Sequence, residues 1–213
     1  MLSLSTLLLA VAVAWAVAAL AVQAIGARAA FRAPYAPPAG RASDGVLYGF
    51  TGAMMPARKE SVSRHPVSFA AGLLLHLGVA ASFVTVLVSI FPFPPALPLG
   101  RFALAPAAGA GLLAGTFLLI RRLATPDLRE ISPPDDFVAI VAITLFLTGS
   151  LAFWSGILPA AALRILATIL LVYLPLGKLR HVVFFYLARA DLSARLGFRG
   201  VYPPRGGGDG GRS

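Results

Sequence analysis

The sequence predicts an all-α integral membrane protein, a bundle of five transmembrane helices. Hydrophobic residues make up 58% of the 213-residue chain, and charged residues only 12%, about half the share of a typical soluble domain. Several apolar stretches exceed the roughly 20 residues that a helix needs to cross a bilayer. We therefore expect one membrane domain over residues 1–202, followed by a disordered Pro-, Arg- and Gly-rich tail, 203–213.

The five spans are expected at about 4–26, 67–90, 103–120, 137–157 and 160–189. The first could instead be a cleaved signal peptide, but it lacks a basic start, and its apolar core from Leu7 to Ala21 is too long. The second begins near Pro66, a residue suited to the first helical position. The third carries Gly111 and Gly115, small residues predicted to pack against another helix.

Basic residues set the expected orientation. Every Lys and Arg except Arg101 and Arg164 falls in the segments 27–66, 121–136 and 190–213 or in the last turns of the fifth span. The positive-inside rule then places the N-terminus outside and the C-terminus in the cytoplasm, in a multi-pass protein of the inner (cytoplasmic) membrane. The net charge of +10 reflects this asymmetry and does not indicate nucleic-acid binding. The absence of cysteine excludes iron–sulfur clusters, thioether-linked haem and disulfides held by this chain.

Two of the three histidines, His76 and His181, lie inside long apolar runs, where an imidazole is costly and usually functional. His76 comes ten residues after Pro66 and His181 nine residues before Ala190, so each is about 15 Å from the expected cytoplasmic end of its span. Matching depth on two helices is what a bis-histidine haem iron needs. The alternative for each is a buried histidine bonded to a serine or a carbonyl.

Glycines repeat this pattern, because Gly72 and Gly177 each come four residues before a histidine. Positions four apart share a helix face, and a side chain there would crowd a flat macrocycle. The same glycines also suit plain helix packing.

Further candidates lie at the cytoplasmic ends of the spans. His65 is expected to be a solvated or capping residue, or else a quinone or haem-propionate contact. Asp135 and Asp136 open the fourth span, where carboxylates favour the helix dipole, and Asp136 could alternatively exchange protons with a quinone. Arg180, next to His181, is a candidate partner for a haem propionate.

Three segments carry a resemblance to a known family. They are Leu75–Gly78 with the apolar run after it; Leu118–Arg122 with Pro126–Arg129 and the Asp135 or Asp136 that opens the next helix; and Leu174–His181. In this order and spacing, over about residues 67–190, they resemble the gamma subunit of respiratory nitrate reductase. That subunit is a five-span cytochrome b membrane anchor, and its fold family also serves heterodisulfide-reductase-like and sulfite-reduction-associated complexes.

The resemblance implies which residues hold haem. The family uses four histidines for two stacked haems, and its cytoplasm-side pair corresponds to His76 and His181. The two outer ligand positions correspond to Val86 and Leu163, which cannot bind iron. We therefore expect a variant with one haem b.

The expected function is that of a membrane anchor and electron-transfer subunit of a respiratory complex. It would relay electrons between a quinone pool and a cytoplasmic iron–sulfur subunit, as a non-catalytic or quinone-reactive part of an oxidoreductase. The alternative is a haem-free structural anchor or assembly subunit. A small-solute transporter is disfavoured, because the sequence shows no internal repeat and few polar residues at mid-membrane depth.

Overall fold

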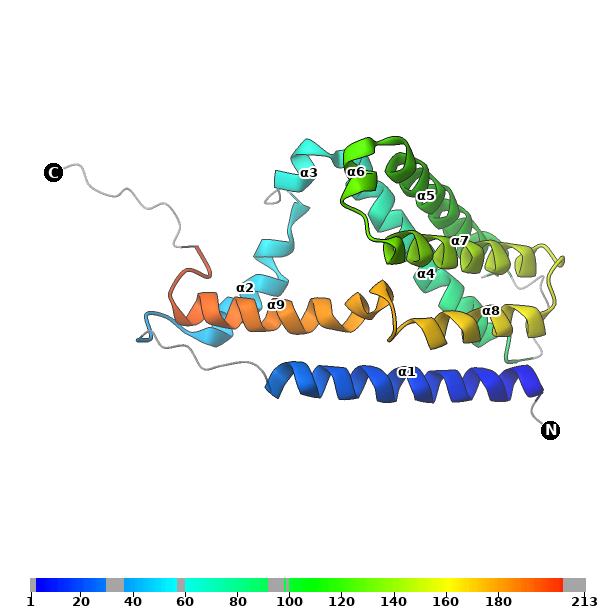
Figure 1. Cartoon of the computed structure of the whole chain (residues 1–213), viewed down its shortest axis with the longest axis horizontal. Helices are drawn as coiled ribbons and strands as arrows, with labels where there is room; N and C mark the ends of the chain where they lie inside the picture. Colours follow the sequence, from blue (N-terminus) through cyan, green and yellow to red (C-terminus); the bar gives the residue numbers. More distant parts are fainter. Residues whose placement is uncertain (1–2, 30–36, 57–59, 92–97, 99, 205–213) are drawn as a thin grey trace. The chain divides into compact units, whose positions relative to one another are not determined.

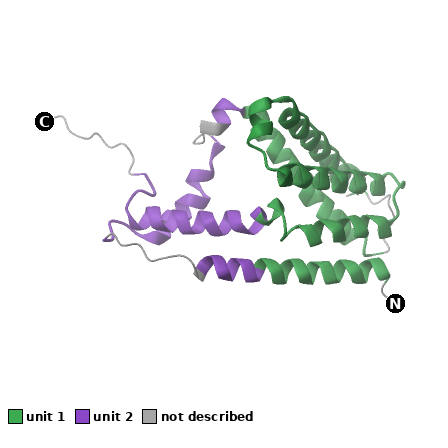
Figure 2. Ribbon diagram, in the orientation of Figure 1, with its two compact units in different colours: residues 1–20, 66–180 green, residues 21–65, 181–213 purple. Residues whose placement is uncertain are grey.

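The structure is a computed structural model that describes residues 3–29, 37–56, 60–91, 98 and 100–204. These residues form helices joined by turns, and no strand occurs among them (Figure 1). The chain divides into two compact units (Figure 2). Unit 1 comprises residues 1–20 and 66–180, and unit 2 comprises residues 21–65 and 181–213. The expected disordered tail lies largely outside the described residues, because only Pro203 and Pro204 of it are described.

Unit 1 holds most of the long apolar helices, with several short helical elements between them. They are the first part of α1 (Leu4–Ala29), α4 (Pro66–Val88), the π-helical turn η3 (Gly100–Leu104), α5 (Ala105–Ala124), the short α6 (Pro126–Glu130), α7 (Pro134–Trp154), α8 (Ala160–Tyr173) and the turn η4 (Lys178–Arg180). Prolines open several of them, because a proline at the start of a helix gives up no backbone hydrogen bond. The sequence expectation that Pro66 begins a helix is confirmed.

Unit 2 contains α2 (Ala42–Phe50), the turn η1 (Gly52–Met54), α3 (Glu60–Arg64) and α9 (His181–Phe198), with the end of α1. Helix α2 lies against α9 through small residues. A Cβ atom on Gly45 would lie 2.2 Å from the Ser193 carbonyl oxygen, and one on Gly197 would lie 2.7 Å from the Gly45 Cα. The two backbones are therefore in direct contact, a packing that only small residues permit. Arg189 Nε donates to the Gly49 carbonyl at 2.7 Å and adds a polar tie.

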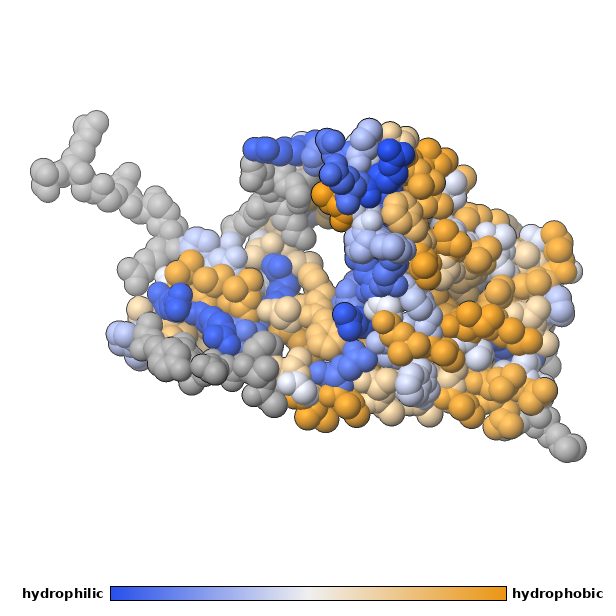
Figure 3. Space-filling model, in the orientation of Figure 1, coloured by the Kyte–Doolittle hydropathy of each residue, from blue (hydrophilic) through white to orange (hydrophobic). Residues whose placement is uncertain are grey.

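A multi-pass membrane protein is supported by helix length and composition. Among the described residues, four helical segments are long and apolar enough to cross a bilayer: Leu4–Arg28, Pro66–Val88, Gly100–Ala124 and Pro134–Trp154. Hydrophobic residues cover much of unit 1 on the face drawn in Figure 3, as expected for spans that contact lipid. A fifth span exists only if α8 and the helical segment Lys178–Phe198 together make one broken span.

The expectation of one continuous fifth helix over 160–189 is wrong. Helix α8 ends at Tyr173, and residues 174–177 form a turn before η4. Pro175 has no N–H to donate and cannot continue the helical ladder. The amides of Leu176 and Gly177 instead both donate to the Tyr173 carbonyl, at 2.9 and 3.0 Å.

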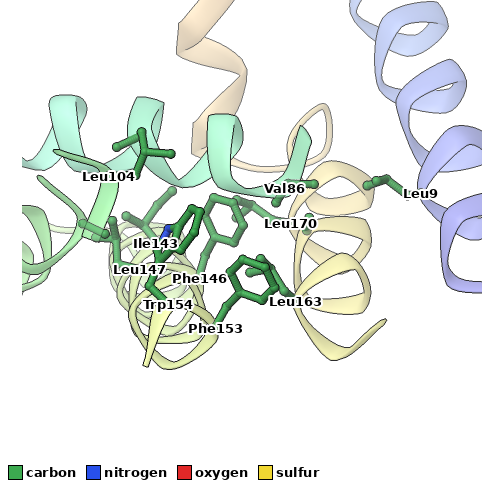
Figure 4. Packing of buried hydrophobic residues seen from close by; sticks show 13 residues of the cluster. Leu9, Val86, Leu104, Ile143, Phe146, Leu147, Phe153, Trp154, Leu163 and Leu170 are labelled. Atoms are coloured by element: carbon green, nitrogen blue, oxygen red, sulfur yellow. The ribbon is translucent and has the colours of Figure 1, made fainter. Parts of the chain in front are cut away.

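The core of unit 1 lies where α4, α7 and α8 meet (Figure 4). Phe146, Leu147 and Leu163 are almost completely buried there. Trp154 Nε1 donates to the Thr85 hydroxyl at 2.9 Å, which ties α7 to α4 inside this apolar region. Nearby, α4 crosses α5 at glycines: a Cβ on Gly78 would lie 2.7 Å from the Gly111 Cα. The predicted role of Gly111 in helix packing is confirmed.

Candidate functional site

His76 lies on an outward face of α4. Its neighbours Leu73 and Leu77 are exposed, and His76 itself is exposed, whereas Gly78 is buried against α5. In a span, this face points away from the packing of unit 1 and toward lipid, a cofactor or another protein. An imidazole there is costly unless it has such a partner.

The ring of His76 is oriented by its own helix. Its Nδ1 lies 2.6 Å from the Gly72 carbonyl oxygen. A carbonyl oxygen only accepts, so Nδ1 carries the hydrogen, and Nε2 of the neutral ring carries the lone pair. Histidines that ligate metals typically donate their other ring N–H to a carbonyl or carboxylate in this way. The arrangement suits axial ligation through Nε2.

Gly72 keeps the surface beside this ring open. A Cβ built on Gly72 meets no atom within 4 Å, so helix packing inside unit 1 does not require glycine there. A flat group lying against α4 at His76 would require it, because a methyl would project toward that group. The expectation that Gly72 makes room for a flat macrocycle beside His76 stays a prediction.

His181 is the first residue of α9 and is exposed. It belongs to unit 2, whereas His76 belongs to unit 1, and their pairing stays a prediction. Gly177 lies in the turn before η4, so it does not share a helix face with His181. The four-residue spacing had predicted that it would, and this expectation is wrong. Packing explains this glycine, because its Cβ would lie 2.3 Å from the Tyr173 ring. The two glycines are therefore not equivalent.

Asp136 is the centre of an ion-pair network that sequence reasoning missed. Its side chain is 6% exposed and pairs with both Arg122 and Lys178. Arg122 also donates to the Ser132 hydroxyl at 3.0 Å. The network joins the end of α5, the start of α7 and η4. The residues are far apart in sequence, so no local pattern indicates the contact.

The neighbouring side chains have separate roles. The Tyr173 hydroxyl donates to the Asp135 carboxylate, which ties the end of α8 to the start of α7. Arg180 is exposed in η4. His65 is exposed between α3 and α4 and belongs to unit 2, whereas Asp136 belongs to unit 1.

The two positions that correspond to outer haem ligands in the resembled family are filled with packed side chains. Val86 is 3% exposed and Leu163 is fully buried, and both belong to the core cluster. Both side chains therefore belong to the apolar core of unit 1.

Arg164 is a buried cation. In the sequence it was only one of the two basic residues outside the segments expected in the cytoplasm. It lies in the second turn of α8, is 9% exposed, and bonds to Ser5 of α1 and to the Ser89 carbonyl just beyond the end of α4. The available signal was its position four residues inside an apolar helix.

Comparison of the chain with protein-family models, curated proteins and solved structures finds no match.

Proposed function

We propose that the chain is the membrane anchor and electron-transfer subunit of a respiratory complex, with one haem b held by His76 and His181. Bound haem supplies one-electron transfer between a quinone pool and a cytoplasmic iron–sulfur subunit. The contribution of this chain is axial ligation, orientation of the ligand rings and an apolar helical surround.

The observation that carries the proposal is the exposed position of His76 on an outward face of a span, beside Gly72, where an added Cβ meets no atom within 4 Å. The bond between Nδ1 and the Gly72 carbonyl is expected both of an oriented haem ligand and of a histidine that is only bonded to a carbonyl, so the haem spectrum decides between the two. The second histidine, His181, ends the Leu174–His181 segment. Its pairing with His76 rests on the family resemblance.

The surrounding charges favour particular roles. Arg122 and Lys178 are engaged with Asp136, so Arg180 is the better placed candidate for a propionate. An ionised carboxylate between two cations is a poor proton acceptor, which favours a structural role for Asp136. His65, exposed just before α4, is then the stronger candidate for proton exchange with a quinone.

The partner follows from the proposed orientation. Basic loops mark the face that the positive-inside rule assigns to the cytoplasm, in a protein of the inner membrane. An iron–sulfur subunit docked on that face would lie on the same side as His76 and His181.

A haem-free structural anchor is the second candidate. The outward face around Gly72 and His76 also suits close packing of a helix from another subunit, with the imidazole bonded across the interface. The two candidate functions predict different spectra. Only the electron-transfer subunit has a haem absorbance, and only there does replacement of His76 remove it.

The experiment is the reduced-minus-oxidised absorbance spectrum of membranes that contain His76→Ala, His181→Ala or His65→Ala variants. We expect either of the first two changes to abolish the low-spin b-type signal at equal protein level. The matched control, His65→Ala, keeps it. A signal that survives His76→Ala would exclude the proposed ligation, and a wild-type complex without haem would favour the structural anchor.

A further inference from the structure

Arg164 joins three helices at the end of unit 1 where α1 begins. Its Nε donates to the Ser5 hydroxyl at 3.0 Å, Nη2 lies 3.5 Å from the Ser3 hydroxyl, and Nη1 donates to the Ser89 carbonyl beyond the end of α4. All of these partners are neutral. A guanidinium carries five N–H donors, so two remain without an acceptor among the described residues.

None of the carboxylates of unit 1 lies near this cation. Its four acidic residues, Asp127, Glu130, Asp135 and Asp136, all lie between the end of α5 and the first turn of α7. Helix α7 has 21 residues and is about 30 Å long, and α8 begins beyond its far end. Arg164, in the second turn of α8, therefore lies about one membrane thickness from these carboxylates. A buried charge without a counter-ion is costly, which points to an anion from outside unit 1.

A purely structural role explains part of this arrangement. The Ser89 carbonyl follows the last turn of α4, where the helix dipole is negative, and a cation there stabilises the helix end. The helix end supplies only a partial charge, however, and two donors of the guanidinium find no acceptor in the part of the chain that the structure describes.

An apolar pocket of about 380 Å³ opens on the same three helices. Nine side chains, all apolar, line it from α1, α8, α4 and the turn that follows α4, among them Leu9, Val86 and Ala167. Figure 4 shows Leu9 and Val86 on facing sides of this region. Leu9 is one turn from Ser5, and Ala167 is one turn from Arg164, so the charged cluster lies one helical turn beyond the pocket.

We propose that this site binds an anionic phospholipid, with its phosphate on Arg164 and one acyl chain in the pocket. A phosphate accepts two parallel N–H bonds from a guanidinium and supplies the missing negative charge. Because α8 begins directly after the candidate span Pro134–Trp154, its second turn would lie near the membrane surface, at the depth of lipid phosphates, and an acyl chain would enter a pocket lined only by apolar side chains. A quinone would match the pocket but not the charge, because its head group is neutral.

The test measures lipid binding to the purified full-length protein by native mass spectrometry in detergent. Phosphatidylglycerol is compared with phosphatidylcholine of the same chains, and glycerol phosphate serves as the head group alone. We expect the wild type to prefer phosphatidylglycerol, and Arg164→Gln to lower its apparent affinity roughly five- to tenfold. The matched control is Arg101→Gln, because Arg101 is exposed near the start of α5. Its preference should be unchanged.

A second pair of variants tests the pocket if Arg164→Gln does not fold. Ala10→Phe adds a ring to an exposed pocket position, whereas Val11→Phe changes an exposed neighbour that does not line the pocket. We expect lipid retention to fall only in Ala10→Phe. Equal retention in both variants, an undiminished preference in Arg164→Gln, or binding of glycerol phosphate as tight as that of the lipid would overturn the proposal.

Discussion

The crossing of α4 and α5 allows a quantitative prediction from one added methyl group. In Gly78→Ala, the new Cβ would lie 2.7 Å from the Gly111 Cα and 2.9 Å from the Ala107 carbonyl oxygen. Carbon atoms pack at about 3.5–4.0 Å, so the helices must separate by about 1 Å. Such overpacking costs about 1–3 kcal/mol, and alanine returns at most about 1 kcal/mol of helix propensity. We expect a net loss of up to about 2 kcal/mol.

Gly109→Ala is the matched control, on the partner helix α5 and away from the proposed haem site. Its Cβ would meet only the Leu151 Cδ1 atom, at an ordinary 3.7 Å, so only the propensity gain remains, and the chain should become more stable by about 0.5–1 kcal/mol. The assay is reversible unfolding of the purified protein in mixed micelles by titration with sodium dodecyl sulfate, followed by circular dichroism. The two midpoints should move in opposite directions. Equal stability of the two variants would refute the close crossing of α4 and α5.

Three further predictions use the same unfolding assay or a topology reporter. Asp136→Asn should destabilise the protein by about 1–2 kcal/mol, because Arg122 and Lys178 lose a shared counter-ion but stay partly solvated, and no change would argue against the network. Trp154→Phe should cost about 1–2 kcal/mol by removing the buried bond to the Thr85 hydroxyl, unless that bond does not form in the membrane. An alkaline phosphatase fused to the C-terminus should be inactive in intact cells, and an active fusion would reverse the proposed orientation.

Most spans were predictable because hydropathy is a local property. The expected bounds of the first four spans lie within a few residues of α1, α4, α5 and α7. The interruption of the fifth span was missed, although Pro175 and Gly177 are typical helix breakers. The run around these two residues is continuously apolar, and hydropathy alone therefore predicts an unbroken span.

The polar contacts were less predictable because they join residues far apart in the chain. Asp136 meets Lys178 from 42 residues away, and Arg164 meets Ser5 from 159 residues away. The sequence indicated that Asp136 begins a helix, but not which cations surround it. The four-residue spacing of Gly72 and His76 predicted that they share a helix face, but not that the His76 ring bonds to the Gly72 carbonyl.

The ratio of haem to chain in the purified membrane complex tests the central claim most directly. One haem b per chain is predicted, because His76 and His181 are the proposed ligand pair, while Val86 and Leu163 lie in the core at the positions that correspond to the outer ligands. A ratio near two would contradict the assignment of a single ligand pair. A ratio near zero would contradict electron transfer by this chain and leave the haem-free anchor.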